Sequence, residues 1–159
     1  MEYGGRSNAE HNLVWVGIIG IFGLLVLFVA YTFWPNGGAT SVSIGPKTFY
    51  ADVADTDETR EIGLTQHATL KENQALLMIY DHDAVRPMMT KGMQFPVDIV
   101  WLDSNKRVAF VARNAKPSET NVFRPSGKTR YVMMFPAGSA AKYNISVGQS
   151  VDFSYTGDM

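Results

Sequence analysis

An uncharged apolar stretch of 22 residues, Leu13–Trp34, constrains this chain more than any other feature of its sequence. As a helix rising ~1.5 Å per residue, it would be about 33 Å long, which matches the hydrocarbon thickness of a bilayer. Trp15 lies near one end of the stretch and Tyr31 near the other, as expected where a span meets the two membrane interfaces. A cleaved signal peptide is the alternative, but its apolar region has only about 7–15 residues and is followed by small residues. The stretch therefore predicts a retained single transmembrane helix.

Basic residues around this stretch predict its orientation. Arg6 precedes it, and no lysine or arginine follows it until Lys47. Because cytoplasmic flanks carry the excess of basic residues, we expect the N-terminus in the cytoplasm and the C-terminal domain outside. We therefore expect a single-pass protein of the bacterial inner membrane with a periplasmic domain. The predicted parts are a cytoplasmic tail (1–12), the transmembrane helix (13–34), a linker (35–41) and an extracytoplasmic domain (42–159).

Three glycines repeat at a spacing of three within the predicted helix, at Gly17, Gly20 and Gly23. Small residues along one flank allow another helix to approach closely, so they predict packing against a further membrane subunit. Glycine is also common in membrane helices in general, and that interpretation stays open.

Composition excludes several classes of function. The chain has 159 residues, which is enough for one folded domain. A net charge of −1 does not favour nucleic-acid binding. The absence of cysteine excludes disulfides, thiol catalysis and thiolate zinc sites. We therefore expect partners among lipid and membrane proteins, and no nucleic acid.

Strand patterns dominate residues 42–159. One short helix is predicted after Asp55, a favourable N-cap, with a stop at Gly63, and a second near Ser139 as its cap. Together the patterns predict an α+β fold, in which a small β-rich domain forms a curled antiparallel sheet or barrel with two short helices. The strands are expected over 48–53, 75–80, 97–102, 107–112, 131–135 and 150–155, with a hairpin turn at "DSNK".

Five segments resemble, in the same order, the pattern of the DUF192 domain: "ADVADTDETREIGL", "ALLMIY", "PVDIVWLDSNKRVAFV", "RYVMMFPAG" and "NISVGQSVDF". The resemblance covers about residues 48–154. It implies a small β-rich domain that is often secreted or membrane-anchored. It implies no particular activity, because none is established for the family.

The sequence departs from that family pattern mainly in one block. The family carries Phe-Trp-Met-Lys-Asn-Thr where this chain has Met-Met-Thr-Lys-Gly-Met at 88–93, so only Lys91 is kept. This chain has Met134 where the family pattern has a glutamate, and Thr65 where the pattern has a methionine. The resemblance therefore implies a pocket whose polar groups are partly replaced by apolar ones.

Lys91 and Asp98 are the candidates for catalysis. A buried lysine can act as nucleophile or base when its pKa is lowered and a carboxylate orients it. Asp98 and Asp103 lie an odd number of residues apart, so a regular strand points them to opposite faces and they cannot act as a joined pair. We therefore expect no catalytic residue. An enzyme that uses Lys91 and Asp98 remains a third functional alternative, after the two that are given below.

Metal binding has one candidate set. Met88, Met89 and Met93 supply thioethers, which bind Cu(I), although methionine also fills irregular cores and adaptable contact surfaces. No zinc-like spacing relates the histidines, which are His11, His67 and His82. We therefore expect no metal and no cofactor, with Cu(I) at the three methionines as the alternative.

The predicted function is that of a single-pass accessory or structural subunit. Its β-rich domain would dock onto a larger membrane protein complex, of a respiratory or photosynthetic type. A membrane-tethered domain that binds a small ligand or Cu(I) is the second alternative. The predicted docking residues are Met88, Met89, Lys91, Met93, Met133 and Met134.

Overall fold

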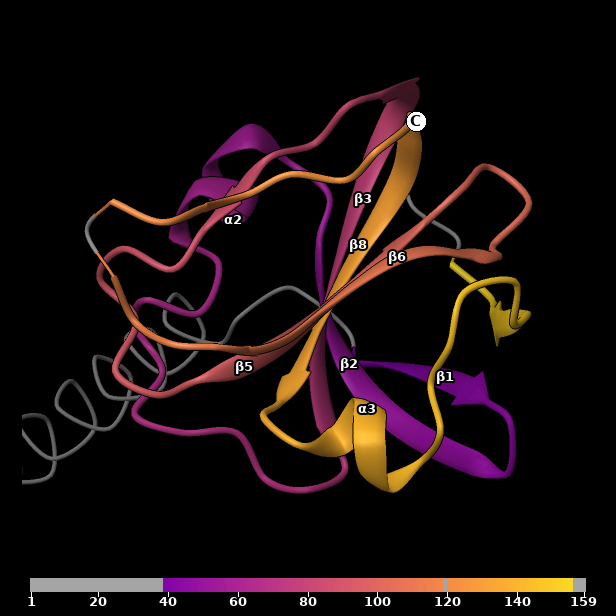
Figure 1. Cartoon of the computed structure of the whole chain (residues 1–159), viewed down its shortest axis with the longest axis horizontal. Helices are drawn as coiled ribbons and strands as arrows, with labels where there is room; N and C mark the ends of the chain where they lie inside the picture. The colour runs from indigo at the N-terminus through magenta and orange to yellow at the C-terminus, as the bar shows by residue number, and fades with distance from the viewer. Residues whose placement is uncertain (1–38, 119, 156–159) are drawn as a thin grey trace, which may run out of the picture. The chain divides into compact units, whose positions relative to one another are not determined.

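The computed structural model describes residues 39–118 and 120–155, and these form the domain drawn in colour in Figure 1. The predicted cytoplasmic tail, the transmembrane helix and its three glycines lie outside the described residues, so they stay predictions. Within the part that is described, no helix is both long enough and apolar enough to cross a bilayer.

One sheet of seven strands makes up most of the domain. Its strands are β1 (Thr40–Ile44), β2 (Lys47–Ala54), β3 (Gln74–Ala84), β5 (Val97–Leu102), β6 (Val108–Ala115), β8 (Thr129–Pro136) and β9 (Val151–Phe153). They lie in the order β6-β5-β8-β3-β2-β1-β9. Neighbours are antiparallel except β2 and β3, which are parallel. An all-antiparallel sheet was expected, and the parallel pair arises because α2 (Asp57–Ile62) supplies the crossover that parallel strands require.

The sheet curls until its two edges approach each other (Figure 1). Arg107, just before β6, forms an antiparallel bridge with Ser150, just before β9. The backbone N–H of Val108 donates to the carbonyl of Gln149 at 2.9 Å. The result is a curled half-barrel sheet which, with the two short helices α2 and α3 (Ser139–Lys142) of the described residues, confirms the predicted small β-rich domain.

Two hydrophobic cores lie on the two faces of this sheet. The inner core contains residues from both edge strands, such as Val108 of β6 and Phe153 of β9, so it is the face that the curl encloses. The outer core lies on the opposite face and includes Trp101 of β5. All six residues of β5 are buried, because this strand has a core on each side.

A short ribbon covers part of the outer core. It consists of β4 (Met88–Met89) and β7 (Val122–Phe123), which pair in antiparallel fashion with Met88 opposite Phe123 and Met89 opposite Val122. The sequence analysis predicted neither strand, because two residues are too few to show a period. It also missed β1, whose first residue, Thr40, falls within the stretch assigned to the linker.

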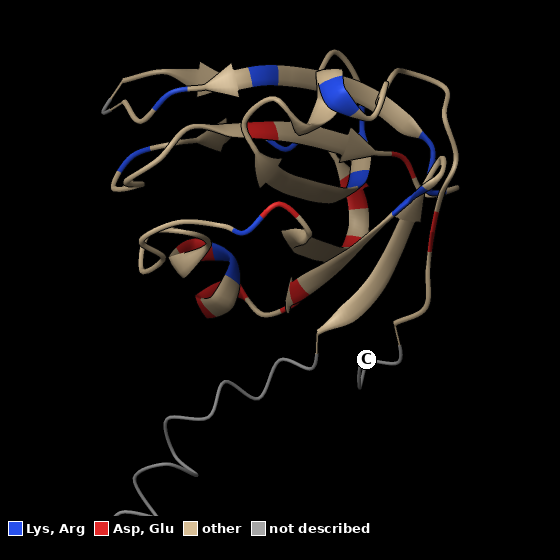
Figure 2. Cartoon of the chain, turned by 90° about the horizontal axis from the view of Figure 1, so that it is seen from below, with Lys and Arg blue, Asp and Glu red and all other residues tan. Residues whose placement is uncertain are grey.

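The helices form near the predicted positions, but other residues cap them. Thr56, not Asp55, is the N-cap of α2, because its hydroxyl accepts the N–H of Thr59 at 3.1 Å while the Thr59 hydroxyl accepts the N–H of Thr56 at 3.0 Å. Gly63 ends this helix, as predicted. Residues of both charges, among them Asp57, lie on it (Figure 2).

The cap of the second helix was predicted wrongly. Gly138 is the N-cap residue of α3, and Ser139 is already inside the helix without a capping hydrogen bond from its side chain. The capping group comes from the sheet instead, because a carboxylate oxygen of Asp98 accepts the N–H of Ala140.

Candidate functional site

The described residues contain a cavity of about 450 Å³ that opens beside the ribbon, and it is called here the methionine cavity. Five of the eight methionines of the chain line it. Its walls come from the end of α2 and the loop after it, from β3 and β8, and from the segment that contains β4. The lining residues are Arg60, Glu61, Ile62, Gly63, Leu64, Thr65, Met78, Tyr80, Pro87, Met88, Met89, Lys91, Met93 and Met134.

The sheet places Met78 and Met134 on the same wall. Met78 pairs with Val132 across β3 and β8, and Met134 pairs with Leu76, so the two methionines are diagonal neighbours on one face. Both are buried in the outer core, with exposed fractions of 3% and 1%. Met133 is the next residue along β8 and therefore lies in the inner core, away from the cavity.

The ribbon divides the next two methionines between its faces. Met88 points inward with Phe123 and is 9% exposed. Met89 and Val122, the adjacent cross-strand pair, are 45% and 50% exposed. An exposed apolar pair thus stands at the mouth of a cavity with buried thioethers.

A tight turn holds Met93 against the cavity. Thr90 is fully buried, and its hydroxyl donates to the carbonyl of Lys116 at 2.7 Å. The N–H of Met93 donates back to the carbonyl of Thr90 at 3.3 Å. Gly92 has φ +75°, and a Cβ at this position would lie 3.3 Å from Cγ2 of Thr65. The turn therefore requires glycine for both its backbone and its close approach to the opposite wall.

Tyr80 forms the polar end of the cavity. The guanidinium groups of Arg60 and Arg86 lie over its ring, 4.8 Å and 4.0 Å from the centroid. Its hydroxyl lies 3.9 Å from Sδ of Met78. Burial raises the pKa of Tyr80, and the two arginines oppose this only in part. The phenol is therefore neutral and donates toward the thioether at neutral pH.

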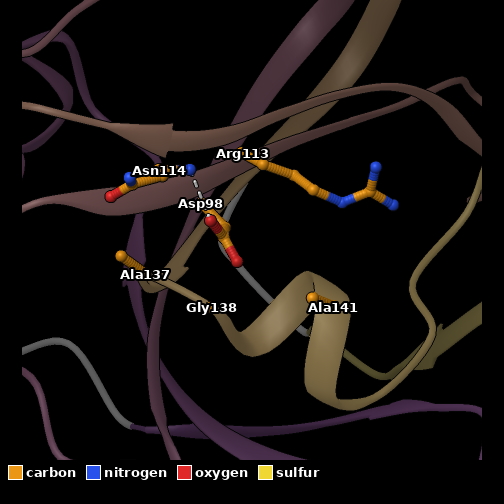
Figure 3. A pocket seen from close by; sticks show the side chains of 6 residues that line it. All are labelled: Asp98, Arg113, Asn114, Ala137, Gly138 and Ala141. Carbon is orange, nitrogen blue, oxygen red and sulfur yellow. Dashed lines mark hydrogen bonds between the residues drawn. The ribbon is translucent and has the colours of Figure 1, made fainter.

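Asp98 belongs to a different pocket, which has a volume of about 380 Å³ (Figure 3). Its carboxylate is fully buried, and its two oxygens accept the N–H groups of Asn114 and Ala140, each at 2.7 Å. The side chain of Arg113 extends away from it (Figure 3) and donates to the carbonyl of Ile145 at 3.2 Å. The carboxylate thus holds β5, β6 and α3 together, which is a structural role.

The structure does not join the candidate catalytic residues. Lys91 lines the methionine cavity and Asp98 lines the second pocket, and no lining residue is common to both. Asp103 opens the predicted turn, where its Oδ1 accepts the N–H groups of Asn105 and Arg107, both at 2.9 Å. Lys91 and Asp98 are therefore not placed to act on one substrate.

Hard metal ligands do not gather within the described residues, where no three His, Asp or Glu side chains are placed to hold an ion. His67 lies 3.8 Å from a carboxylate oxygen of Asp52 and not in the methionine cavity. His82 is exposed on β3, and His11 lies outside the described residues.

The profile of the DUF192 family, described as "Uncharacterized ACR", matches residues 40–153. The chain belongs to the DUF192 family. No curated protein matches it significantly. The match begins at the first residue of β1 and ends at the last residue of β9, so the family's unit is the entire half-barrel.

Two solved structures have a similar fold. One is a protein of Sinorhizobium meliloti 1021 that was proposed to be a transcription regulator, with a TM-score of 0.71, 18% identity, and coverage of 74% of this chain and 95% of that chain. The other is a protein of unknown function from Novosphingobium aromaticivorans DSM 12444, with a TM-score of 0.67, 22% identity, and coverage of 72% and 83%. At these identities the likeness shows the fold alone.

The positions at which this chain departs from the DUF192 pattern meet in space. Thr65, Met89 and Met134 line the methionine cavity, and Gly92 approaches Thr65 from the opposite wall. Lys91, which the pattern keeps, also lines it. The resemblance implied a pocket with altered polarity, and these residues are indeed gathered around one cavity.

Sequence reasoning missed three contributors to this site. Met78 was assigned only to a buried strand, although its alternation with Leu76 and Tyr80 already indicated a shared face. No sequence pattern indicated that Arg60 and Tyr80 belong to the site, because the two side chains come into contact only through the crossover that α2 forms.

Proposed function

We propose that this DUF192 protein is a membrane-anchored docking subunit whose half-barrel binds a partner polypeptide at the mouth of the methionine cavity. The observation that carries the proposal is the exposed pair Met89 and Val122, which stands beside a cavity lined by further methionines. Isolated exposed apolar residues are ordinary, but a cross-strand pair that continues into a methionine-rich cavity is typical of contact surfaces.

The chemistry of the cavity defines the partner. Methionine is flexible and polarizable, so Met89 at the mouth of the cavity can adapt to an aliphatic or aromatic side chain that packs against it and Val122. Glu61 and Lys91 line the same opening and supply charged groups around an apolar centre, as in other protein interfaces. The partner is therefore a polypeptide that presents a bulky apolar side chain flanked by polar groups.

The predicted transmembrane helix places this contact close to a bilayer. A tether restricts the domain to partners in the same membrane and raises their effective concentration. A subunit of a larger membrane complex, of the respiratory or photosynthetic type, is the partner that fits both the anchor and the docking surface. The glycines of the helix would supply a second contact within the membrane.

The experiment compares lysine substitutions at three exposed apolar residues of the full chain in mild detergent. Val122→Lys and Met89→Lys place a charge at the mouth of the cavity, whereas Val147→Lys places one at a site that is 66% exposed and outside the cavity lining. Native mass analysis is expected to show a defined complex for the wild type and for Val147→Lys, and its loss for the other two. A monomer at every detergent level, or equal loss with Val147→Lys, would overturn the proposal.

A further inference from the structure

We infer that the interior of the methionine cavity is a binding site for a soft monovalent cation, Cu(I), held by thioether sulfurs. The proposed ligands are Met78, Met88, Met93 and Met134. Docking uses the outward-facing Met89 and Val122, so this inference does not rest on the proposed docking function.

The four side chains meet from segments that are far apart in the sequence. Met78 and Met134 project from neighbouring strands of the sheet, and Met88 and Met93 come from the ribbon and the turn that cover it. Each is at most 9% exposed, yet each borders a cavity of about 450 Å³. The four side chains thus expose little surface to bulk water, yet they border a space that a small ion can enter.

The donor set selects the metal. Thioethers are soft, neutral ligands that prefer Cu(I) over Mg²⁺, Ca²⁺ or Mn²⁺, which take oxygen ligands. The chain has no cysteine that would compete for a soft ion. Glu61 is the one carboxylate in the cavity lining, and the described residues contain no cluster of hard ligands. A hard divalent ion therefore finds no suitable set of ligands here.

Charges near the cavity do not prevent this binding. The Arg60 guanidinium forms an ion pair with Asp57 at 2.6 Å and donates a hydrogen bond to the carbonyl of Ile79, also at 2.6 Å. Lys91 adds a positive charge to the lining and Glu61 adds a negative one. A monovalent ion also has a smaller desolvation cost than a divalent one, so neutral sulfurs suffice.

The test is an anaerobic titration of the full chain in detergent with Cu(I) against a chromophoric Cu(I) chelator, with Ag(I) as a stand-in that is stable to air. One ion is expected to bind per chain. Replacing Met88, Met93 or Met134 by leucine nearly conserves volume, so packing is kept while a sulfur is lost. Each replacement is expected to weaken Cu(I) binding by roughly tenfold or more. The loss of a group that only supports a metal ligand already has an effect of this size, so the loss of a ligand itself should cost at least as much.

Met133→Leu is the matched control. It removes a thioether that is equally buried and adjacent in sequence to Met134, but that lies in the inner core. Its affinity for Cu(I) is expected to equal that of the wild type, and X-ray absorption of the bound copper should show sulfur ligation.

Three results would overturn the inference. The first is that the wild-type chain fails to compete with the chelator. The second is that the leucine variants bind Cu(I) as tightly as the wild type, which would mean that the ion is held by other groups of the chain. The third is that Met133→Leu weakens binding as much as Met134→Leu. If one exchange unfolds the domain, the remaining single exchanges decide between these outcomes.

Discussion

The carboxylate of Asp98 lies 2.7 Å from the backbone nitrogen of Ala140, a residue 42 positions further along the chain. This contact fixes the first turn of α3 to β5, the second strand of the sheet. The other carboxylate oxygen of Asp98 binds the N–H of Asn114, which has φ +51° on the bent edge strand β6. One buried side chain thus joins three elements of the half-barrel, and the first prediction follows from it.

Asp98→Asn should destabilise the domain by about 2 kcal/mol, because the amide has one acceptor oxygen for two N–H groups, of which that of Ala140 is buried. Urea unfolding measures the change. Asp103→Asn is the control, since both N–H groups at the turn bind Oδ1 of Asp103 alone, which an asparagine keeps. A similar loss in both variants would contradict the structural role assigned to Asp98.

Gly92→Ala should cost about 1–2 kcal/mol, the usual penalty for a side chain in the left-handed backbone region. The added methyl group also meets Cγ2 of Thr65 at 3.3 Å, which disturbs the turn that carries Met93. Gly127→Ala serves as the comparison, because a Cβ there meets nothing within 4 Å and φ is not positive. Thermal unfolding of both variants checks the difference, and equal stability would be inconsistent with a strained turn at Gly92.

Glu72 should titrate far below an ordinary glutamate. Hydrogen bonds from Lys142 and from the hydroxyl of Tyr143 lower its pKa from 4.5 to about 2. The stabilisation is therefore present above about pH 4.5 and is lost as the pH falls toward 2. It is small because the group is fully exposed to solvent.

An NMR titration of the Glu72 carboxyl carbon measures this pKa directly. Lys142→Met is expected to raise it toward the ordinary value, and Tyr143→Phe to raise it by less, because the lysine supplies the larger contribution. An unchanged pKa in Lys142→Met would show that the ion pair is absent in solution.

Tyr80 should ionise later than an ordinary tyrosine, since burial raises its pKa above 10.0. The unfolded chain then loses this proton first as the pH rises, so stability declines above about pH 10. Tyrosinate absorbance during alkaline titration measures the effect. Tyr80→Phe is expected to remove the late-titrating component, and Tyr50→Phe, at a tyrosine that is 54% exposed, to leave it in place.

Much of the sheet was predictable because short apolar runs bounded by turn residues are a local property of the sequence. The strand at 97–102 has the predicted bounds of β5, and the turn that opens at Asp103 has the predicted form. β1, β4 and β7 were missed, since the first lies beside a glycine-rich segment and the others have two residues each. Ser139 was predicted as a helix cap from its residue type. The carboxylate of Asp98, which is distant in the sequence, accepts the N–H of the first helical turn instead.

The sequence by itself determined that the chain carries a β-rich DUF192 domain, and that neighbouring methionines such as Met133 and Met134 face opposite ways. The first conclusion follows from the resemblance of five segments to the family pattern, and the second from the two-residue period of a strand, which needs no knowledge of partners. Only the tertiary structure decided that Met134 joins Met78, Met88 and Met93 around one cavity while Met133 packs in the other core. The register between strands and the curl of the sheet set that choice, because they bring together segments that the chain keeps far apart.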